Sequence, residues 1–595
     1  MSILSEHKLD YPFDPDLLLR KRKAIKRELL EQDIKWLDKK IAILGGSTTN
    51  DIRDFIEIFL LKEGIRPVFY ESEYNKYWED AMFGNPELDE FKPDIVFIHT
   101  SHHNIKNWPV ISMKSSEIDQ ILKDEFENFK MMWEKLEQRF ECPIVQNNFD
   151  RPSYRLLGNK DISDEHGRSN FVYRLNGLFY EYASHHPNFF IHDIDYLSAQ
   201  YGIGKWQDEQ YWTRYKYAFA LRAVPEFAYS LTRIIKSVYG KNKKVLALDL
   251  DNTLWGGVVG DDGVDNLEIG PETALAEAHL GFQKYLAQIR ELGVLLTVNS
   301  KNDEENAIAG LKHPNNALHP EDFALIKANW FSKDENILST AKELNLGVDS
   351  IVFIDDNPAE RNIVRSQLPV VSVPEVEQPE YFINAIDRAG YFEVTSLTAD
   401  DLQRNEMYKA NAARLEVQKS FADYGEYLRS LEMQAEIGDF TPVNIQRVAQ
   451  LTNKTNQFNL TTKRYSEADI TAISADDSYI RLCGSLKDKF GDNGIVSIVL
   501  GKIDGEAIDI ELWLMSCRVL KRDFELAMFD KLIEECKKKG VKTLRGFYYP
   551  TAKNGMVKDF YSGLGFSKVS EENGNTEWLY EIDSHVKKNN IISII

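Results

Sequence analysis

The segment 243–257, with the sequence KKVLALDLDNTLWGG, constrains the fold of this chain more than any other stretch. Its apolar run Val245–Leu248 stands beside Gly-rich turn residues, a pattern typical of a parallel strand covered on both faces. Asp249 and Asp251 follow the run, and open α/β sheets bind ligands at the carboxyl ends of their strands. An isolated Asp-x-Asp pair in front of a helix is more often a helix cap, so the pair alone is not decisive.

Further polar groups stand at or just beyond the ends of predicted elements. One apolar strand ends at Ser300 and another ends in Asp355 and Asp356, while Lys333 opens an amphipathic helix. Paired acids at a strand end can hold a hard cation such as Mg²⁺, and a carboxylate can attack phosphorus to form an aspartyl-phosphate. The spacing therefore favours an α/β domain with phosphate chemistry at one edge of its sheet.

The order acid pair, hydroxyl, lysine, acid pair resembles the haloacid dehalogenase (HAD) superfamily of phosphohydrolases and phosphotransferases. The resemblance implies that Asp249 is the nucleophile and Asp251 the general acid/base. It also implies a Mg²⁺ site drawn from Asp249, Asp251, Asp355 and Asp356, to which Asp251 contributes its backbone carbonyl. Which of Asp355 and Asp356 binds the metal, and which orients the lysine, stays open at this point.

Ser300 and Lys333 complete the expected phosphate site. An anionic nucleophile is repelled by an anionic phosphate, and Mg²⁺, Lys333 and the Ser300 hydroxyl would offset that repulsion. Taken singly, such a serine is more often a helix cap and such a lysine a solvated surface charge. The complete set, in this order, favours catalytic roles for both.

Composition narrows the class of protein. A chain of 595 residues is too long for one core, and three or four domains are expected. The apolar runs are too short for a membrane helix, and the first residues differ from a signal peptide. Four scattered cysteines without a CxxC pair argue against zinc or disulfides and for a reducing cytoplasm. A net charge of −22 argues against non-specific nucleic-acid binding.

The first domain, expected over residues 1–240, alternates strands and helices as a doubly wound, flavodoxin-like parallel sheet does. The Gly-Gly-Ser turn after its first strand resembles the SGNH-hydrolase fold, where Ser47 would be the nucleophile. Ser47 could equally cap the following helix or help bind an anion. An Asp-x-x-His that completes the triad is not recognisable, so we expect a catalytically degenerate domain that serves docking or substrate positioning. The strands are expected at 40–46, 67–70, 93–100, 142–146 and 188–193.

The remaining chain is expected to hold a HAD-like Rossmannoid core at 241–385 and an α+β domain at 386–595. The Gly- and Asp-rich turn 253–270 leaves little room for a cap domain over the HAD core, which suits carrier-bound substrates. In the last domain we expect a long helix over 398–428, an antiparallel sheet, and helices at 524–538 and 554–564. Its tail KDFYSGLGF resembles GNAT-type acyltransferases.

Several long strings between about Ile191 and Phe566 resemble the FkbH-like proteins, HAD subfamily IIIC enzymes of secondary-metabolite and polysaccharide clusters. The resemblance implies capture of the three-carbon unit of 1,3-bisphosphoglycerate, loss of its phosphates, and loading as a glyceryl thioester on an acyl carrier protein. The partner would present a phosphopantetheine arm. The strings are DLDNTLWGGVVGDDG, NSKND, NWFSKDENI, FIDDNPAER, QLTNKTNQFNLTTKRY, DKFGDNGIVS, LMSCRVLKR and YYPTAKN.

Cys517 is the expected acyl acceptor, because thiolates attack acyl phosphates readily. Arg518, Lys521 and Arg522 follow it, and nearby cations lower the pKa of a thiol. The alternative is a buried structural cysteine. The stretch has no glycine where a coenzyme A-binding GNAT turn carries them, so its side-chain cations, Arg518 among them, are expected to hold a single phosphate, such as that of a phosphopantetheine arm.

An amide-rich stretch gives the last candidate binding residues. They would contact the glycerate hydroxyls or the pantetheine amides, although such stretches also serve as loop caps. The lead hypothesis is a bifunctional phosphatase and glyceryl transferase. The alternative is a HAD phosphatase of a polysaccharide or secondary-metabolite pathway whose C-terminal domain only binds. The residues are Asn453, Lys454, Asn456, Gln457 and Asn459.

Overall fold

The computed structural model describes residues 9–397, 399–551 and 553–595. Contacts divide the chain into two compact units: one runs up to Val238 and includes Glu393–Ser396, and the other comprises Tyr239–Phe392 and Leu397–Ile595. Both units combine sheets with helices, so the expected multidomain α/β architecture is confirmed. Within the described ranges, every helix is too short or too polar to cross a membrane.

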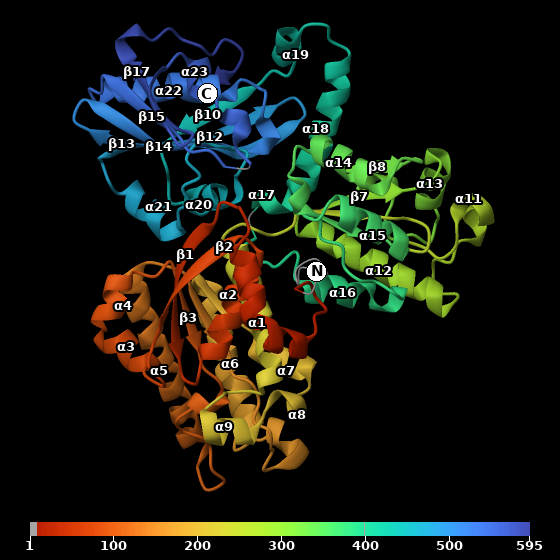
Figure 1. The fold of residues 1–595 in the computed structure, drawn as a ribbon, viewed down its shortest axis with the longest axis vertical. Coiled ribbons are helices and arrows are strands. Elements are labelled where there is room, and N and C mark those ends of the chain that lie inside the picture. Colours follow the sequence, from red (N-terminus) through yellow and green to blue (C-terminus); the bar gives the residue numbers. More distant parts are fainter. Residues whose placement is uncertain (1–8, 398, 552) are drawn as a thin grey trace. The chain divides into compact units, whose positions relative to one another are not determined.

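A five-stranded parallel sheet forms the centre of the first unit, with helices on both of its faces (Figure 1). The strand order β2-β1-β3-β4-β5 reverses direction between β1 and β3, which creates a topological switch point there. All five strands predicted for this region are present. They are β1 (Leu37–Gly45), β2 (Ile65–Glu71), β3 (Ile95–His99), β4 (Ile144–Asn147) and β5 (Phe189–His192).

The helices of this unit bury apolar stripes against the sheet. In α2, Ile52, Phe55, Ile56 and Phe59 recur at helical spacing and are all buried. The segment Glu393–Ser396 rejoins this unit, and the Glu393 carbonyl accepts a hydrogen bond from Ser237 at 2.9 Å. The helices are α1 (Pro15–Leu30), α2 (Asn50–Lys62), α3 (Tyr77–Phe83), α4 (Pro86–Phe91), α5 (Ser115–Phe140), α6 (Arg168–His185), α7 (Ile194–Tyr201), α8 (Ile203–Trp206), α9 (Glu209–Tyr215) and α10 (Val224–Val238).

The second unit begins with a four-stranded parallel sheet of order β8-β7-β6-β9. The strands β6 (Val245–Leu248), β7 (Leu295–Ser300) and β9 (Ile351–Ile354) are fully buried apolar runs, as their sequences predict. Their parallel pairing brings their carboxyl ends to one edge. The other elements are β8 (Leu325–Ala328), α11 (Val259–Asp262), α12 (Ala274–Glu291), α13 (Glu304–Leu311), α14 (Lys333–Glu343), α15 (Pro358–Gln367) and α16 (Phe382–Ala389).

The helix expected over 398–428 is interrupted in the structure. It consists of α17 (Ala399–Leu402), α18 (Arg404–Lys419) and α19 (Tyr424–Ser430). The cause of the second break is local, because the Asp423 side chain accepts a hydrogen bond from the Glu426 amide at 2.8 Å and thereby starts a new helix. The expectation of one continuous helix was therefore wrong.

A nine-stranded sheet fills the rest of the second unit. It is mostly antiparallel, as expected, but β14 and β15 pair in parallel because α22 connects them as a crossover. The helix expected at 554–564 is reduced to the short α23. The elements are β10 (Gln434–Gly438), α20 (Ile445–Lys454), β11 (Phe458–Asn459), α21 (Glu467–Ser474), β12 (Tyr479–Asp488), β13 (Gly491–Asp504), β14 (Ala507–Met515), α22 (Phe524–Lys538), β15 (Thr543–Tyr548), α23 (Phe560–Leu564), β16 (Ser567–Glu572), β17 (Asn575–Glu581) and β18 (Ser593–Ile594).

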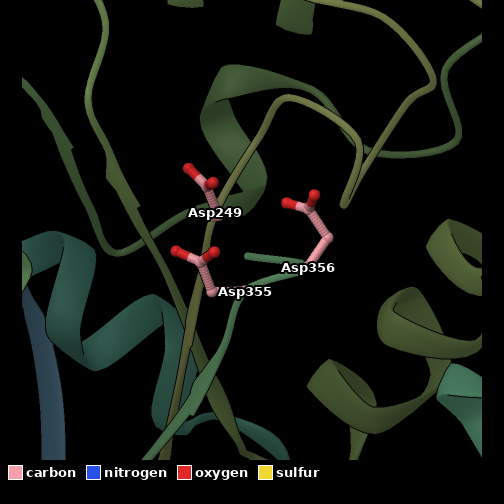
Figure 2. Close-up of side chains that lie close together, drawn as sticks. All are labelled: Asp249, Asp355 and Asp356. Atoms are coloured by element: carbon pink, nitrogen blue, oxygen red, sulfur yellow. The ribbon is translucent and has the colours of Figure 1, made fainter. Parts of the chain in front are cut away.

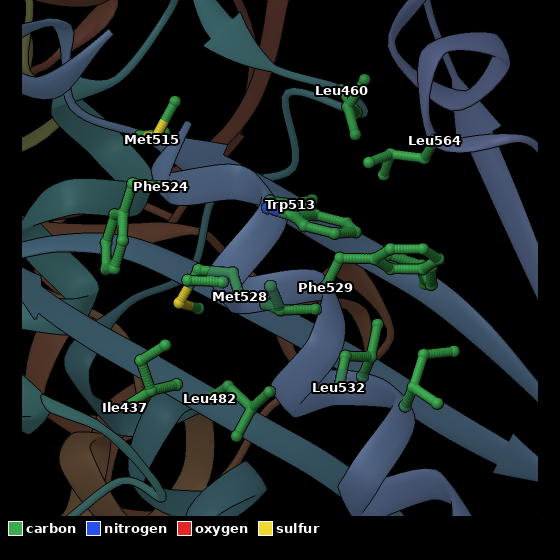
Figure 3. Close-up of a cluster of buried hydrophobic side chains, with 14 of the residues drawn as sticks. Ile437, Leu460, Leu482, Trp513, Met515, Phe524, Met528, Phe529, Leu532 and Leu564 are labelled. Atoms are coloured by element: carbon green, nitrogen blue, oxygen red, sulfur yellow. The ribbon is translucent and has the colours of Figure 1, made fainter. Parts of the chain in front are cut away.

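Apolar side chains of α22 form the core beneath this sheet. Met528, Phe529 and Leu532 pack together with Trp513 of β14 and Leu482 of β12 (Figure 3). These side chains are almost entirely excluded from solvent. Burial of one such side chain contributes about 1.5–3 kcal/mol to the stability of the fold. Together these contacts hold α22 against the sheet.

Candidate active site

Three carboxylates converge at the carboxyl edge of the four-stranded sheet. Asp249 follows β6, and Asp355 and Asp356 follow β9, the strand paired with β6. One oxygen from each carboxylate lies within 4.8 Å of the other two (Figure 2). Uncompensated carboxylates at this spacing repel one another, so the arrangement requires cations beside it.

Lys333 is one such cation. Its Nζ lies 2.7 Å from Asp249 Oδ1 and 3.1 Å from Asp355 Oδ2, and the side chain is almost completely buried. Burial disfavours the ammonium, but the two carboxylates outweigh it and raise the pKa of Lys333. The helix that Lys333 opens places it at the acid cluster, as the sequence predicts. Ser300 is buried at the end of β7, the strand on the other side of β6.

The two acids after β9 have different surroundings. Asp355 is fully buried; besides the contact with Lys333, it accepts a hydrogen bond from the Asn357 amide at 2.8 Å. Burial and the neighbouring Asp249 raise the pKa of Asp355 to about 6. Asp356 is partly exposed and interacts with the Thr253 hydroxyl at 3.3 Å. Asp355 is thus the one of the two that contacts the lysine, while both acids belong to the carboxylate cluster.

The side chain of Asp251 is held outside that cluster. Its Oδ1 accepts hydrogen bonds from Trp255 Nε1 and the Val259 amide, both at 3.0 Å. Its Oδ2 accepts one from Asn302 at 2.9 Å. Burial raises the pKa of Asp251, and these hydrogen bonds oppose the rise. Of the expected metal ligands, Asp251 is therefore the one whose carboxylate does not join the cluster. This arrangement agrees with the expectation that Asp251 binds the metal through its backbone carbonyl and uses its carboxyl group as the general acid/base.

The cluster fits a hard divalent cation. Its donors are all carboxylate oxygens, the ligand type that Mg²⁺ prefers. Asp249 Oδ1 and Asp355 Oδ2 are buried and, among the described residues, lack a partner with hydrogen-bond geometry, although both face Lys333. Three acids against one lysine leave an excess of negative charge that a divalent ion would balance.

Sequence reasoning missed several residues that support the site. Asn299 accepts from Lys333 Nζ through its carbonyl at 2.7 Å and donates its side-chain amide to the Lys333 carbonyl at 2.9 Å. Arg361 donates to the carbonyls of Asp355 and Asp356 at 2.8 and 2.7 Å. Asn299 lies inside the motif NSKND and Arg361 inside FIDDNPAER. Their place in these motifs was the one feature of the sequence that could have indicated a role at the site.

Cys517 lies away from the acid cluster. It starts a 3₁₀ turn, Cys517–Val519, and its side chain packs against the apolar core of the four-stranded sheet. Its carbonyl accepts a hydrogen bond from Asn345 Nδ2 at 3.1 Å, and its Sγ lies 3.7 Å from the Tyr408 hydroxyl. Asn345 follows the end of α14 opposite to Lys333, so the structure does not bring the thiol and the acids together.

The amide-rich stretch makes mostly internal contacts. Asn453 donates to the Tyr465 carbonyl, and Asn456 accepts from Arg464. Asn459 is fully buried and accepts a hydrogen bond from the Thr462 amide at 2.8 Å. Lys454 pairs with Asp401, and Gln457 is partly exposed. Arg518 is buried and donates to Met407 Sδ at 2.8 Å. A binding role for these residues stays a prediction.

Ser47 lies just past the end of β1, at the switch point of the first sheet. The side chain is 2% exposed, and its hydroxyl lacks a hydrogen-bond partner among the described residues. Asn104 Nδ2 donates to the neighbouring Gly46 carbonyl at 2.9 Å. His102, which follows β3, pairs with Asp150 at 3.0 Å, a contact that sequence reasoning did not anticipate. A nucleophilic role for Ser47 stays a prediction.

The chain is similar to solved structures that include a phosphatase domain. A structure described as the N-terminal part of a Bacteroides fragilis protein, containing a phosphatase domain and complexed with Mg, is 29% identical with a TM-score of 0.58. The match covers 63% of this chain and 99% of that one. The Escherichia coli ribosomal-protein-S18-alanine N-acetyltransferase matches at 13% identity and a TM-score of 0.21, covering 26% of this chain and 99% of its own. Such a score does not establish a shared fold.

No curated protein matches this chain. The family comparison concerns its first unit, in the region where an SGNH-like sheet was expected and ahead of most of the strings that resemble FkbH-like proteins. Residues 40–236 match the family described as FkbH, N-terminal domain.

Proposed function

We propose that the second unit is a Mg²⁺-dependent phosphohydrolase of the HAD type. The observation that carries this proposal is the convergence of Asp249, Asp355 and Asp356 on a single point beside Lys333. The Bacteroides fragilis structure, with its phosphatase domain and Mg, supports it. A Mg²⁺ ion bound by the three carboxylates would offset the charge of an incoming phosphate ester.

The roles of the chain's own residues follow from their surroundings. Asp249 is the nucleophile, because Lys333 holds its carboxylate at 2.7 Å and the rest of the cluster flanks it. Attack on phosphorus forms an aspartyl-phosphate and expels the alkoxide. Asp251 donates the proton to that alkoxide, since burial raises its pKa and three hydrogen bonds fix its carboxylate outside the cluster. It then takes a proton from the water that hydrolyses the intermediate.

The finer proposal is glyceryl transfer. The substrate is a 1,3-bisphosphoglycerate-derived three-carbon unit, Cys517 accepts its acyl group, and an acyl carrier protein receives the resulting thioester. The resemblance to FkbH-like proteins and the match of residues 40–236 to the FkbH N-terminal domain support this reading. A thiol that is partly exposed at the start of a 3₁₀ turn is accessible for such an exchange.

A second candidate function has its own support. Cys517 and the acid cluster stand at opposite ends of α14, so phosphate release does not depend on the thiol through direct contact. In that case the chain is a phosphatase whose C-terminal domain only binds. Replacing Cys517 by Ser separates the two candidates: carrier loading disappears under glyceryl transfer, and release of the ester phosphate is unchanged under both.

The test of the phosphohydrolase uses the full chain with 3-phosphoglycerate and 1,3-bisphosphoglycerate as probes. Release of the ester phosphate should require Mg²⁺, stop with EDTA, and fall by at least about 10⁴-fold in Asp249→Asn, as expected on loss of a covalent nucleophile. Asp265 is an exposed acid of the same domain, so Asp265→Asn is the matched control and should leave the rate of phosphate release unchanged. Equal release by Asp249→Asn and the native chain contradicts the proposal.

A further inference from the structure

An ion pair crosses the carboxyl edge of the four-stranded sheet. Lys301 Nζ donates a hydrogen bond to Glu360 Oε1 at 2.6 Å. Lys301 is the first residue after β7, and Glu360 lies in the first turn of α15, which follows β9. In the order β8-β7-β6-β9, the strands β7 and β9 flank β6 on its two sides. The pair therefore bridges two strand spacings, roughly 10 Å, at the end of β6, where Asp249 stands.

The residue that follows each partner of this pair contacts the acid site. Asn302 donates to the Asp251 carboxylate at 2.9 Å, and Arg361 donates to the Asp355 carbonyl at 2.8 Å. These hydrogen bonds hold the chain on both sides of the ion pair next to the acids. The pair thus lies at the mouth of the candidate active site and not on a distant part of the surface.

The two lysines at this edge differ in their freedom to meet a ligand. The Lys333 side chain is 2% exposed and lies between Asp249 and Asp355, so it is committed to the acid cluster. The Lys301 side chain is 38% exposed and has one acidic partner among the described residues. An ammonium group has three N–H donors. After the bond to Glu360, Lys301 therefore keeps donors for a group that enters from solvent.

Glu360 is the fixed partner of the pair. Its side chain is 15% exposed, and its Oε2 is buried without a hydrogen-bond partner among the described residues. Lys301 instead carries its charge on a long and flexible stem, whose free rotation would cost entropy whenever it had to bind a ligand. The carboxylate removes part of that freedom in advance and aims the ammonium across the end of β6.

A substrate with a second anionic group needs such a cation. The carboxylates of Asp249, Asp355 and Asp356 repel any further negative charge near them. In a small phosphate ester of a hydroxy acid, the carboxylate stands only a few bonds from the ester oxygen. The cation that balances this carboxylate must therefore lie at the mouth of the same site, outside the acid cluster. Lys301 satisfies both conditions.

We propose that Lys301 binds the carboxylate of the substrate whose phosphate ester is hydrolysed at the acid cluster, and that Glu360 positions Lys301 for this contact. The inference rests on the proposed phosphohydrolase and is independent of the acyl transfer. It names the substrate class of that site, which is small phosphate esters of hydroxy acids. Lys301 is then a specificity-determining residue, because an ester with a neutral group in place of the carboxylate lacks the contact.

The experiment compares two esters that differ at the end remote from the phosphate. Where 3-phosphoglycerate carries a carboxylate, glycerol 3-phosphate carries a neutral hydroxymethyl group. Both are measured with the full chain and Mg²⁺, as kcat/KM or as inhibition constants against p-nitrophenyl phosphate. The native chain should favour 3-phosphoglycerate by about 10–100-fold, as expected for one charge-assisted hydrogen bond. This ratio should fall to near one in Lys301→Met and largely return in Lys301→Arg.

Two further variants test where the ratio comes from. Lys312 is an exposed lysine just past the end of α13, so Lys312→Met is the matched control and should show the native ratio. Glu360→Ala should lower the ratio in the native background. It should not lower the ratio further in Lys301→Met, because Glu360 acts through Lys301. A loss of structure alone would lower both rates alike and leave the ratio at its native value.

The outcomes separate the inference from the function on which it rests. A native ratio near one, or a native-like ratio in Lys301→Met, overturns the inference and keeps the phosphohydrolase. An unchanged or higher ratio in Glu360→Ala overturns the positioning role of Glu360. If the native chain with Mg²⁺ hydrolyses neither p-nitrophenyl phosphate nor either ester, the phosphohydrolase fails and the inference fails with it.

Discussion

Asn299 holds Lys333 at both ends of the lysine residue. The Asn299 carbonyl accepts from Lys333 Nζ at 2.7 Å, and the Asn299 side-chain amide donates to the Lys333 carbonyl at 2.9 Å. The first contact aims the ammonium at Asp249, and the second fixes the first turn of α14 against β7. Asn299 therefore positions the cation of the acid cluster through hydrogen bonds to Lys333 itself.

We predict that Asn299→Ala reduces phosphate release by about 10–100-fold, a range typical for the loss of a group that orients a site residue. The backbone contact to Nζ remains, but the anchor of the helix turn is lost, so kcat should fall more than KM rises. Steady-state phosphate release checks this. Asn362→Ala, which alters an exposed asparagine of α15, is the control and should behave as the native chain. An unchanged kcat in Asn299→Ala would show that the turn is held by other contacts.

Lys333→Met should expose the repulsion within the acid cluster. The substitution keeps the length of the side chain but leaves Asp249 and the fully buried Asp355 without their shared cation. Removal of one partner from a buried ion pair costs about 3–5 kcal/mol in the free energy of unfolding. Chemical denaturation in EDTA should show that loss, and added Mg²⁺ should recover part of it. Equal stability of the two proteins in EDTA would contradict the electrostatic account.

Asp355→Asn tests the same cluster from the opposite side. The folded-state pKa of Asp355 is raised to about 6, so ionising this group destabilises the metal-free protein. Its contribution to stability is fully present below the unfolded pKa and is lost as pH rises through about 6. In EDTA, Asp355→Asn should therefore be more stable than the native chain at pH 7.5, by up to about 3 kcal/mol, and the difference should vanish near pH 4.

Magnesium reverses that comparison. The asparagine cannot replace the carboxylate as a Mg²⁺ ligand, so thermal stabilisation by Mg²⁺ should be large in the native chain and small in Asp355→Asn. Thermal unfolding with and without Mg²⁺ at pH 7.5 measures this difference. Equal stabilisation of both proteins would place the metal elsewhere.

The acid cluster was predictable because it depends on the ends of strands. Parallel strands bring their carboxyl ends to one edge, so Asp249, Asp355 and Lys333 could be placed together from three separate motifs. The orientation of each side chain could not be read in this way. Asp251 turns away from the cluster because hydrogen bonds from Trp255 and the Val259 amide fix its carboxylate. Neither hydrogen bond follows from a periodic pattern in the sequence.

The residues around the Cys517 thiol could not be predicted from the sequence, for a different reason. Asn345, Tyr408 and Cys517 come from segments far apart in the chain, and only packing of the C-terminal part against the four-stranded sheet brings them together. The parallel pairing of β14 with β15 was missed because apolar alternation gives the face of a strand and not its direction. Long-range packing, rather than local pattern, decided both features.

The last prediction concerns a buried ion-pair network in the C-terminal part. The Asp488 side chain is fully buried, and its two oxygens accept from Arg414 at 2.7 and 2.8 Å and from Arg522 at 3.1 Å. Arg522 follows the turn that carries Cys517, so this network ties that turn to α18. Asp488→Asn should cost about 3–5 kcal/mol in the free energy of unfolding, because two buried guanidinium groups lose their countercharge.

The matched comparison is Asp439→Asn, which breaks the pair between Asp439 and Arg481. The Asp439 side chain is 56% exposed, and exposed pairs contribute at most about 1 kcal/mol. Urea denaturation of the two variants measures the difference directly. If Asp488→Asn also slows acylation of Cys517 at temperatures where the protein stays folded, the network positions the thiol as well as stabilising the fold. If both variants lose equally little stability, water rather than Asp488 balances the two arginines.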